Sequence, residues 1–377
     1  MKIVSKDSFL STYSKYQQQL VKEYESALIL KEKGYKKEQI YNKVKITNKS
    51  RLWHWFIQKK TPYPLKSIEF LKNRKLFPLT SNFYGFRTLL KIFAWCFGDG
   101  TIGKNDYYIC LTGQKEDLEK LAEEIKSVLG FKTRIKVLNF KGREGAYHLE
   151  IQGKGNRILG RLLFAMGAPV GDKVVQEFYL PDWLMKSQKW IKVEFLDVLF
   201  ANEIKIPMLQ KNKIASVSGL DFRMQKSLPL MDNHLKFLNQ IKGALSKLGI
   251  ETGEAKPCKG DYTRQDDVIS KSAGFRILTN QLNFLKFSSI FKFECCNYKK
   301  EILENVKRKI MAKVTKDIKM IDVYRETIKM KEINKSYIKT ARLKNLPEGR
   351  VKSWFEGSKP RFYDDKEDIE KCLKILM

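Results

Sequence analysis

One pattern of helix and strand occurs twice in the middle of this chain, and it limits the folds that the chain can adopt. Residues 115–129 carry apolar residues at helical spacing on one face, and Gly130 follows as a C-terminal cap. Residues 232–248 repeat this arrangement and are followed by Gly249. Stretches with alternating polar and apolar residues flank both helices. We therefore predict two halves, each with helices packed on one face of a sheet.

The opposite face of each predicted sheet is polar and carries basic residues. In residues 132–137, Lys132, Arg134 and Lys136 alternate with residues suited to a core. In residues 220–225, Asp221, Arg223 and Gln225 lie on the polar side of a similar alternation. Helices would cover the apolar faces, and phosphate groups could meet the basic ones.

Each half begins with an apolar helix that runs into an acid. Residues 92–100 lead to Asp99 and Gly100, and residues 195–203 end on Glu203. A helix C-terminus disfavours negative charge, so an acid kept there suggests a nearby cation, with Gly100 expected to cap the helix. If the second segment is shifted by one residue, Asn202 takes the place of Glu203.

These two segments resemble degenerate copies of the LAGLIDADG motif of homing endonucleases. The linker at residues 167–184 is similar to the connection that precedes the second motif in archaeal and intein-borne members. The resemblance covers roughly residues 80–310. It implies an α+β fold with a pseudo-two-fold duplicated αββαββα arrangement, whose saddle-shaped antiparallel sheets lie in the DNA major groove. It also implies that Asp99 and Glu203 are catalytic and hold Mg²⁺ or Mn²⁺, each acid serving one strand.

The two ends of the chain resemble each other. Residues 51–62 and 350–360 share an aromatic pair and basic residues, with a spacing that differs by one residue. Two short helical patterns precede each copy, so both ends are typical of a helix-turn-helix module. A generic three-helix unit with Trp55 and Trp354 in its core is the alternative.

The charge of the chain predicts a polyanionic partner. Lysine and arginine number 73 against 42 acidic residues, a formal net charge of +31. Double-stranded DNA is the expected partner, with binding that weakens steeply in salt. Residues 1–20 lack the apolar core of a signal peptide, and no stretch is apolar enough to span a membrane, so we expect a cytoplasmic monomer. The six cysteines contain no CxxC pair, which disfavours a zinc site.

We therefore expect four domains: residues 1–78 and 313–377 as helix-turn-helix-like modules, and 79–190 and 191–312 as the two LAGLIDADG halves. The ends lack splicing residues, so we expect a stand-alone product and not an intein. The basic residues expected to bind DNA lie in both halves and both end modules: Lys132, Arg134, Lys136, Lys211, Lys213, Arg223, Arg51, Lys59, Lys60, Arg350 and Lys352.

The expected function is a site-specific, magnesium-dependent DNA endonuclease. Two alternatives stay open. The degenerate second motif favours a non-catalytic DNA-binding regulator, similar to the WhiA sporulation factors. An RNA maturase is the other alternative, and it would bind a structured intron with the basic faces of the same saddle-shaped sheets.

Overall fold

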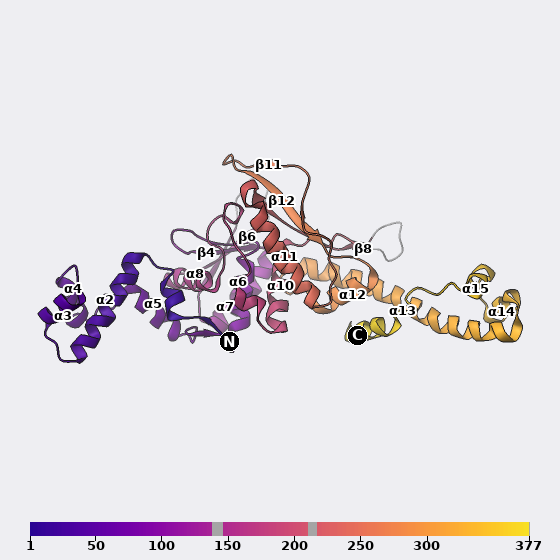
Figure 1. The fold of residues 1–377 in the computed structure, drawn as a ribbon, viewed down its shortest axis with the longest axis horizontal. Coiled ribbons are helices and arrows are strands. Elements are labelled where there is room, and N and C mark those ends of the chain that lie inside the picture. The colour runs from indigo at the N-terminus through magenta and orange to yellow at the C-terminus, as the bar shows by residue number, and fades with distance from the viewer. Residues whose placement is uncertain (138–145, 210–216, 377) are drawn as a thin grey trace. The chain divides into compact units, whose positions relative to one another are not determined.

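The computed structural model describes residues 1–137, 146–209 and 217–376, and these form two compact units. Unit 1 comprises Met1–Asn202, Gln225–Phe237 and Asp261–Lys271; unit 2 comprises Glu203–Met224, Leu238–Gly260 and Ser272–Met377. Figure 1 labels their helices and strands. Among the described residues, no helix combines the length and apolar character that crossing a membrane requires.

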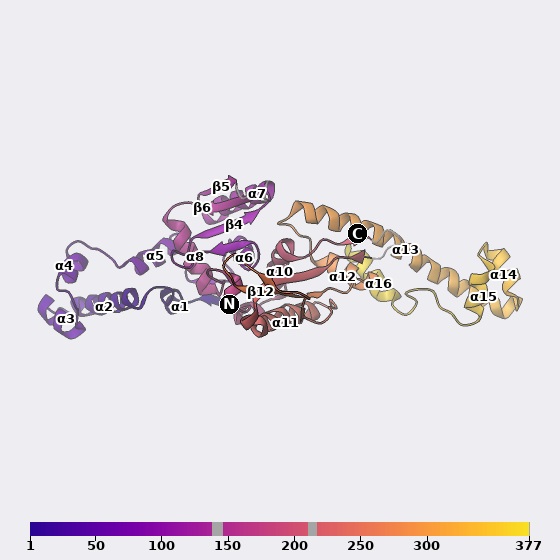
Figure 2. The same cartoon turned by 90° about the horizontal axis from the view of Figure 1, so that it is seen from above.

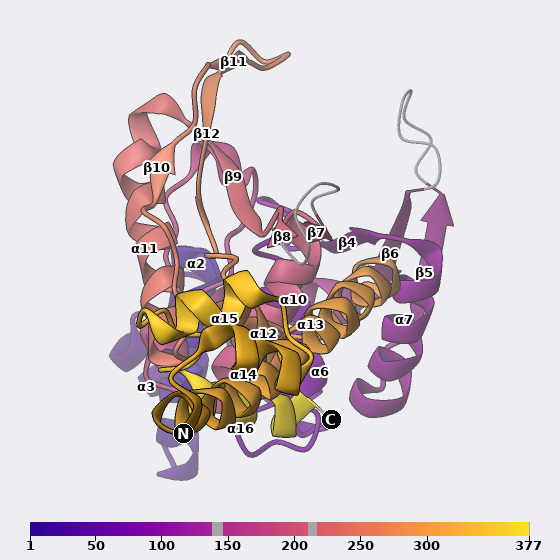
Figure 3. The ribbon, with the colours of Figure 1, turned by 90° about the vertical axis from the view of Figure 1, so that its right-hand side faces the viewer.

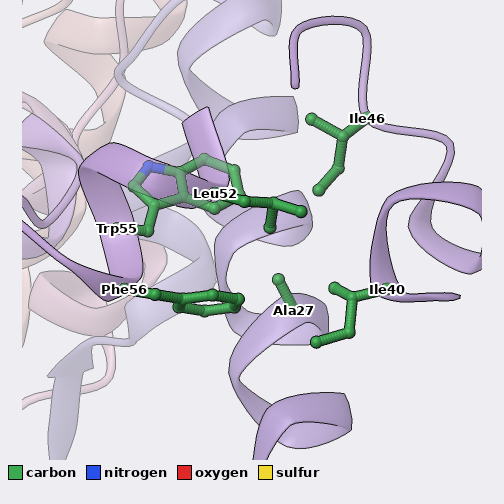
Figure 4. Packing of buried hydrophobic residues seen from close by; sticks show 6 residues of the cluster. All are labelled: Ala27, Ile40, Ile46, Leu52, Trp55 and Phe56. Carbon is green, nitrogen blue, oxygen red and sulfur yellow. The ribbon is translucent and has the colours of Figure 1, made fainter. Parts of the chain in front are cut away.

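The N-terminal part of unit 1 is mostly helical. Its elements are β1 (Lys2–Val4), α1 (Lys6–Leu10), α2 (Lys15–Glu32), α3 (Lys37–Val44), α4 (Ser50–Phe56), α5 (Tyr63–Lys72) and β2 (Leu79–Thr80), and β1 pairs with β2. Helices α2, α3 and α4 share a small apolar core. Figure 4 shows its side chains, which are Ala27, Ile40, Ile46, Leu52, Trp55 and Phe56. The core explains why these short helices fold: each buries one apolar face against the others.

The first central segment has the element order αββαββα. It consists of α6 (Phe86–Trp95), β3 (Gly100–Ile102), β4 (Ile109–Gly113), α7 (Lys115–Leu129), β5 (Thr133–Val137), β6 (Tyr147–Ile151) and α8 (Lys154–Met166). The four strands form an antiparallel sheet in the order β3-β4-β6-β5. Figures 2 and 3 show α7 alongside this sheet.

The two faces of this sheet differ in burial. Ile109, Leu111, Leu149 and Ile151 are buried on the face that α7 and α8 cover. The other face carries half-buried and exposed polar side chains. The alternation predicted for residues 132–137 holds only in part: Arg134 and Lys136 are exposed and Ile135 is half-buried, but Val137, expected on the core side, is 57% exposed near the strand end.

Helix α10 (Lys189–Glu203) packs beside α6, after η1 (Lys173–Val175) and α9 (Asp182–Met185). Three contacts join them: the rings of Phe86 and Trp190 at 6.1 Å, Arg87 and Glu194 at 3.1 Å, and the rings of Phe93 and Phe195 at 5.8 Å. The residue numbers rise together along both helices. The two helices therefore run in the same direction.

The second central segment contains β7 (Met208–Leu209), β8 (Val217–Ser218), β9 (Asp221–Ser227), η2 (Leu228–Leu230), α11 (Met231–Lys247), β10 (Lys256–Pro257), β11 (Tyr262–Thr263), β12 (Ile269–Arg276) and α12 (Gln281–Ile290). Strand β7 pairs antiparallel with β8, and an isolated bridge joins Ile204 to Phe222 in β9. Strand β9 pairs with β12, which also pairs with β10 and β11.

Unit 2 ends in helices. Helix α13 (Asn297–Asn334) has 38 residues and is followed by α14 (Tyr337–Lys344), α15 (Glu348–Phe355) and α16 (Lys366–Leu376). Residue 313, the expected start of the last domain, lies inside α13.

The α+β class with small antiparallel sheets is confirmed. The pseudo-two-fold relation between the central halves and the division into four domains remain predictions.

Candidate functional site

Asp99 lies in a tight turn between a helix and a strand of unit 1. Helix α6 ends at Trp95, and its C-cap is Cys96, so Asp99 comes four residues after the helix and its side chain is exposed. The expectation that Gly100 caps α6 was wrong, because Gly100 is the first residue of β3. A Cβ atom on Gly100 would lie 2.8 Å from the Trp95 carbonyl oxygen. Close packing against the helix end is the reason for glycine here.

The ammonium group of Lys173 closes this turn. Its Nζ donates hydrogen bonds to the carbonyl oxygens of Cys96 at 3.3 Å and Gly100 at 2.7 Å, and also to that of Gly98. Carbonyl groups at a helix end carry partial negative charge, which a lysine neutralises. A lysine of the chain itself therefore neutralises the carbonyl groups of the turn that carries Asp99. The sequence motif did not reveal this role.

Lys226, near the end of β9, lies next to Lys173. Its side chain is buried, its Nζ lies 3.8 Å from the centre of the Phe178 ring, and it donates a hydrogen bond of 2.9 Å to the Lys173 carbonyl oxygen. Burial lowers the pKa of Lys226 to about 8, although Asp172 and Glu177 oppose the shift. Sequence reasoning missed this residue as well.

An ion pair completes the charged surroundings of Lys173. The Arg264 guanidinium lies 2.7 Å from the Asp172 carboxylate. Desolvation is the largest single effect and would raise the pKa of Asp172, but the hydrogen bonds from Arg264 and the Val174 N–H, together with the charges of Arg264 and Lys173, lower it. We call Lys173, Lys226 and Arg264 the basic cluster; all three belong to unit 1.

Glu203 ends α10 and is the first residue of unit 2. Both Glu203 and the preceding Asn202 are half-buried. Since α10 runs in the same direction as α6, the helix ends that precede the two acids point the same way. Glu203 as the second acid, with Asn202 in the alternative register, stays a prediction.

The polar face of the first sheet carries two of the predicted DNA-binding residues. Arg134 and Lys136 on β5 are exposed, and both form ion pairs with Glu150 on β6, at 3.4 Å and 2.8 Å. Desolvation alone would raise the pKa of Glu150, but hydrogen bonds from Lys136 and Tyr108 contribute to a pKa that is lowered. Lys132 is exposed just before β5. This face is therefore basic but contains an internal acid, which the alternation did not predict.

The polar face of the second sheet lines a cavity of about 530 Å³ in unit 2. Arg223 is exposed there, as expected. Asp221, expected on the same open face, is instead buried, and its carboxylate lies 2.7 Å from the Arg276 guanidinium and 3.6 Å from that of Arg223. Lys256 and Lys259 also line the cavity.

The predicted residues of the end modules lie in different environments. Arg51 is largely buried and pairs with Glu23 at 2.7 Å, whereas Lys59 and Lys60 are exposed. Arg350 and Lys352 on α15 are both exposed. The remaining two predicted residues, Lys211 and Lys213, lie outside the described residues.

Within the described part of the chain, no three His, Cys, Asp or Glu side chains gather as a metal site. Cys110 Sγ and His148 Nδ1 do lie 3.1 Å apart on the first sheet. Burial raises the pKa of Cys110 to about 11, so it is a thiol at neutral pH and a poor nucleophile.

No protein-family profile matches the chain. By sequence it is 31% identical over 205 residues to the DNA-directed RNA polymerase subunit Rpo1N of Methanocaldococcus jannaschii, covering 50% of this chain and 15% of that protein. It is 24% identical over 337 residues to the tRNA-splicing ligase RtcB of the same organism, covering 82% and 34%. A third relative there is the replication factor C small subunit, 24% identical over 269 residues, covering 68% and 14%.

The chain thus spans at most 34% of the length of these three relatives. They are named for RNA synthesis, tRNA splicing and replication, which are all processes of nucleic acids.

Two solved structures resemble the fold at low similarity. A mesophilic variant of the homing endonuclease I-DmoI has a TM-score of 0.31 and 13% identity, covering 53% of this chain and 88% of that chain. Full-length DUF199/WhiA from Thermatoga maritima has a TM-score of 0.32 and 10% identity, covering 79% and 97%. I-DmoI has been solved in complex with DNA and Ca, and with DNA and Mn. TM-scores this low do not establish a shared fold.

Proposed function

We propose that this chain is a site-specific double-stranded DNA endonuclease of the LAGLIDADG type, with Asp99 and Glu203 as metal ligands. The observation that carries the proposal is the packing of α6 beside α10 in the same direction. Each of these apolar helices leads into one of the acids. Carboxylate oxygens are ligands that a divalent cation such as Mg²⁺ prefers, which supports these two acids as its ligands.

The residues present fit magnesium or manganese. Carboxylate oxygens are hard ligands, and Mg²⁺ is commonly held by one or two carboxylates, with water and phosphate oxygens completing its shell. A site of this kind needs no third protein acid. When bound, the ion would supply an activated water and stabilise the leaving oxygen of the phosphodiester.

The chain's own residues bind and orient the DNA in this proposal. The carboxylates of Asp99 and Glu203 hold the ion, and the positive charge of the basic cluster offsets the phosphate charge near the Asp99 turn. The polar faces of the two sheets, with Lys132, Arg134 and Arg223, contact the DNA backbone and grooves.

The sequence relatives support a separable module. Three proteins with different named activities each match this chain over a minor part of their length. A segment common to a polymerase subunit, a ligase and a replication factor does not account for any one of those activities. An endonuclease module that is independent of its surroundings is consistent with such a distribution.

The test uses the purified chain, a pool of random and genomic DNA, and Mg²⁺, with sequencing of bound fragments and of cleaved ends. We expect discrete double-strand ends from the wild type. Asp99→Asn and Glu203→Gln should reduce cleavage about a hundredfold or more and leave binding intact. Asp182→Asn, at an exposed acid of α9, is the matched control and should cleave normally.

Two other outcomes are informative. Bound DNA without any cleaved ends would contradict the endonuclease and favour the non-catalytic regulator. Full activity of Glu203→Gln would remove Glu203 from the site, and loss of activity in Asn202→Ala would then favour the alternative register.

A further inference from the structure

The two ends of the chain share one packing arrangement. In the N-terminal module, α2–α4, the rings of Tyr24 and Trp55 pack edge to face. Tyr324 and Trp354 do the same in the C-terminal module, α13–α15. The ring centres are 5.4 Å and 5.3 Å apart, and the interplanar angle is 87° in both pairs. Both pairs join the first helix of the module to the third. The two tyrosines are 300 positions apart in the sequence and the two tryptophans 299. The matching geometry indicates that both modules have the same three-helix structure.

Further contacts recur at the same positions. Lys31 Nζ lies 4.6 Å from the centre of the Phe56 ring, and Lys331 Nζ lies 5.6 Å from that of Phe355. The middle helices end alike. Lys45 and Asn345 both adopt the left-handed conformation, with φ of 55° and 50°. In both modules the next residue donates its backbone N–H into the helix end: Ile46 to the Tyr41 carbonyl at 3.3 Å, and Leu346 to that of Ala341 at 2.9 Å.

These equivalences align the third helices, α4 and α15. Their inner sides correspond: the buried Leu52, Trp55 and Phe56 are matched by the buried Val351 and Trp354 and the half-buried Phe355. Apart from the shared arginine, Arg51 and Arg350, four other positions differ. Ser50, Trp53 and Ile57 are exposed and His54 is half-buried on or after α4, whereas Gly349, Lys352, Ser353 and Glu356 are exposed on or after α15.

The surroundings of both helices are strongly basic. Residues 36–60 contain eight lysines and arginines and one acid, and residues 335–361 contain eight and two. A basic surface around an exposed third helix suits the DNA backbone, with the helix itself in the major groove. We infer that the two modules are copies of one double-stranded DNA reading unit, whose third helices α4 and α15 recognise different base sequences. This inference rests on the proposed DNA binding, but not on cleavage.

The outer faces indicate which bases each module prefers. Lys352 can donate to guanine O6 and N7, and Glu356 can accept from cytosine N4, so α15 should favour G·C pairs. Trp53 and Ile57 are 47% and 56% exposed and offer apolar contact to the thymine methyl group, so α4 should favour A·T pairs.

The shared arginine has different roles in the two modules. Arg51 is held by the buried carboxylate of Glu23 and by the Tyr16 hydroxyl at 3.1 Å, so it helps to fix α4 on α2. Arg350 is exposed and lies 3.8 Å from the sulfur of Met320. Arg350 is therefore the arginine of this pair that is better placed to contact a phosphate.

The experiment selects bound sequences from a randomised DNA duplex library with full-length protein carrying Asp99→Asn, so that binding is read without cleavage. The double substitution Trp53→Lys and His54→Ser copies two of the four outer positions of α15, Lys352 and Ser353, onto α4. It should change the preference in one segment of the selected sequence from A·T toward G·C and leave the rest unchanged. Lys352→Ala should relax a different segment and weaken binding to the selected site about tenfold.

Matched controls distinguish base recognition by the third helices from a general effect of losing a positive charge. Lys22→Ala on α2 and Lys329→Ala on α13 remove exposed lysines away from the third helices and should leave the selected sequence unchanged. Circular dichroism and thermal unfolding confirm that each variant is folded. A selected sequence that both third-helix variants leave unchanged would overturn the inference while leaving DNA binding in place. If the library contains no bound duplex for any protein, the proposed function fails as well.

Discussion

Lys226 is a buried lysine whose positive charge is unfavourable in the folded chain, because burial removes its ammonium group from water. Its ammonium group is buried against Phe178 and has one hydrogen bond, to the Lys173 carbonyl oxygen. Burial lowers its pKa to about 8, below the value of an exposed lysine. Below pH 8 the residue is protonated in both the folded and the unfolded chain, and the folded state bears the full cost of burying the charge.

This cost predicts a pH dependence of stability. Above pH 8 the folded chain releases the proton while the unfolded chain still binds it, so the free energy of unfolding rises with pH. Between pH 8 and pH 10 we expect the wild type to gain roughly 2–3 kcal/mol relative to Lys226→Met, which has no titrating group there. Urea denaturation of both proteins across this range measures the difference. Parallel pH profiles would show that the lysine is not desolvated.

At the scale of elements, two helical glycines have opposite surroundings. Gly160 in α8 lies against the backbone of Tyr107, where an added Cβ would come within 1.8 Å of the carbonyl oxygen. Gly243 in α11 has no atom within 4 Å of such a Cβ. The first glycine allows α8 to approach the loop between β3 and β4, and the second only lowers helix propensity.

Alanine at these two positions should therefore have effects of opposite sign. We expect Gly160→Ala to lower the free energy of unfolding by about 1–3 kcal/mol, because the backbone must move apart. Gly243→Ala should raise it by about 0.5–1 kcal/mol through helix propensity alone. Denaturant unfolding of the two variants checks both signs, and destabilisation by Gly243→Ala would contradict the open surroundings of that residue.

Helix bounds could be predicted from the sequence where the spacing of apolar residues and a following glycine define the helix. The structure has α7 at Lys115–Leu129 with Gly130 at φ 69°, and α11 at Met231–Lys247 with Gly249 at φ 75°, both within a residue of the predicted bounds. The end of α6 was less predictable, because Gly100 is required by packing against Trp95 and not by helix capping. Asp221 was assigned to the open face by alternation, but its pairing with Arg276 buries it.

The basic cluster could not be predicted because it depends on contacts between distant parts of the chain. Lys173 reaches the carbonyl oxygens of residues 73–77 positions earlier, and Lys226 reaches Lys173 across 53 positions. Neither lysine stands out in a chain with 73 basic residues. Asp99 and Glu203, by contrast, follow strongly apolar segments and are visible in the sequence.

At the scale of the whole molecule, the net charge of +31 predicts that the proposed binding of DNA weakens as the salt concentration rises. Each phosphate contact releases condensed counterions, so the logarithm of the DNA association constant falls linearly with the logarithm of salt concentration. Arg134 and Lys136 contribute less than their charge suggests, because Glu150 pairs with both.

Replacing Glu150 should therefore strengthen DNA binding. Glu150→Gln frees Arg134 and Lys136 for phosphates, and we expect tighter binding at low salt with a slope steeper by about 1–2. Glu119→Gln, at an exposed acid of α7 paired with Lys115, is the control and should leave the slope unchanged. Fluorescence anisotropy with duplex DNA at several salt concentrations gives the slopes. Equal slopes for Glu150→Gln and the wild type would place this face outside the DNA contact.

The lysine that closes the Asp99 turn has a consequence for the order of events in binding. Three carbonyl groups of the turn are already joined to the Lys173 ammonium by hydrogen bonds. The backbone around Asp99 is thus ordered during folding, and little conformational entropy remains to be lost when an ion or a phosphate arrives. The backbone that carries the Asp99 carboxylate is pre-organised, and recognition at this turn should resemble the docking of rigid surfaces.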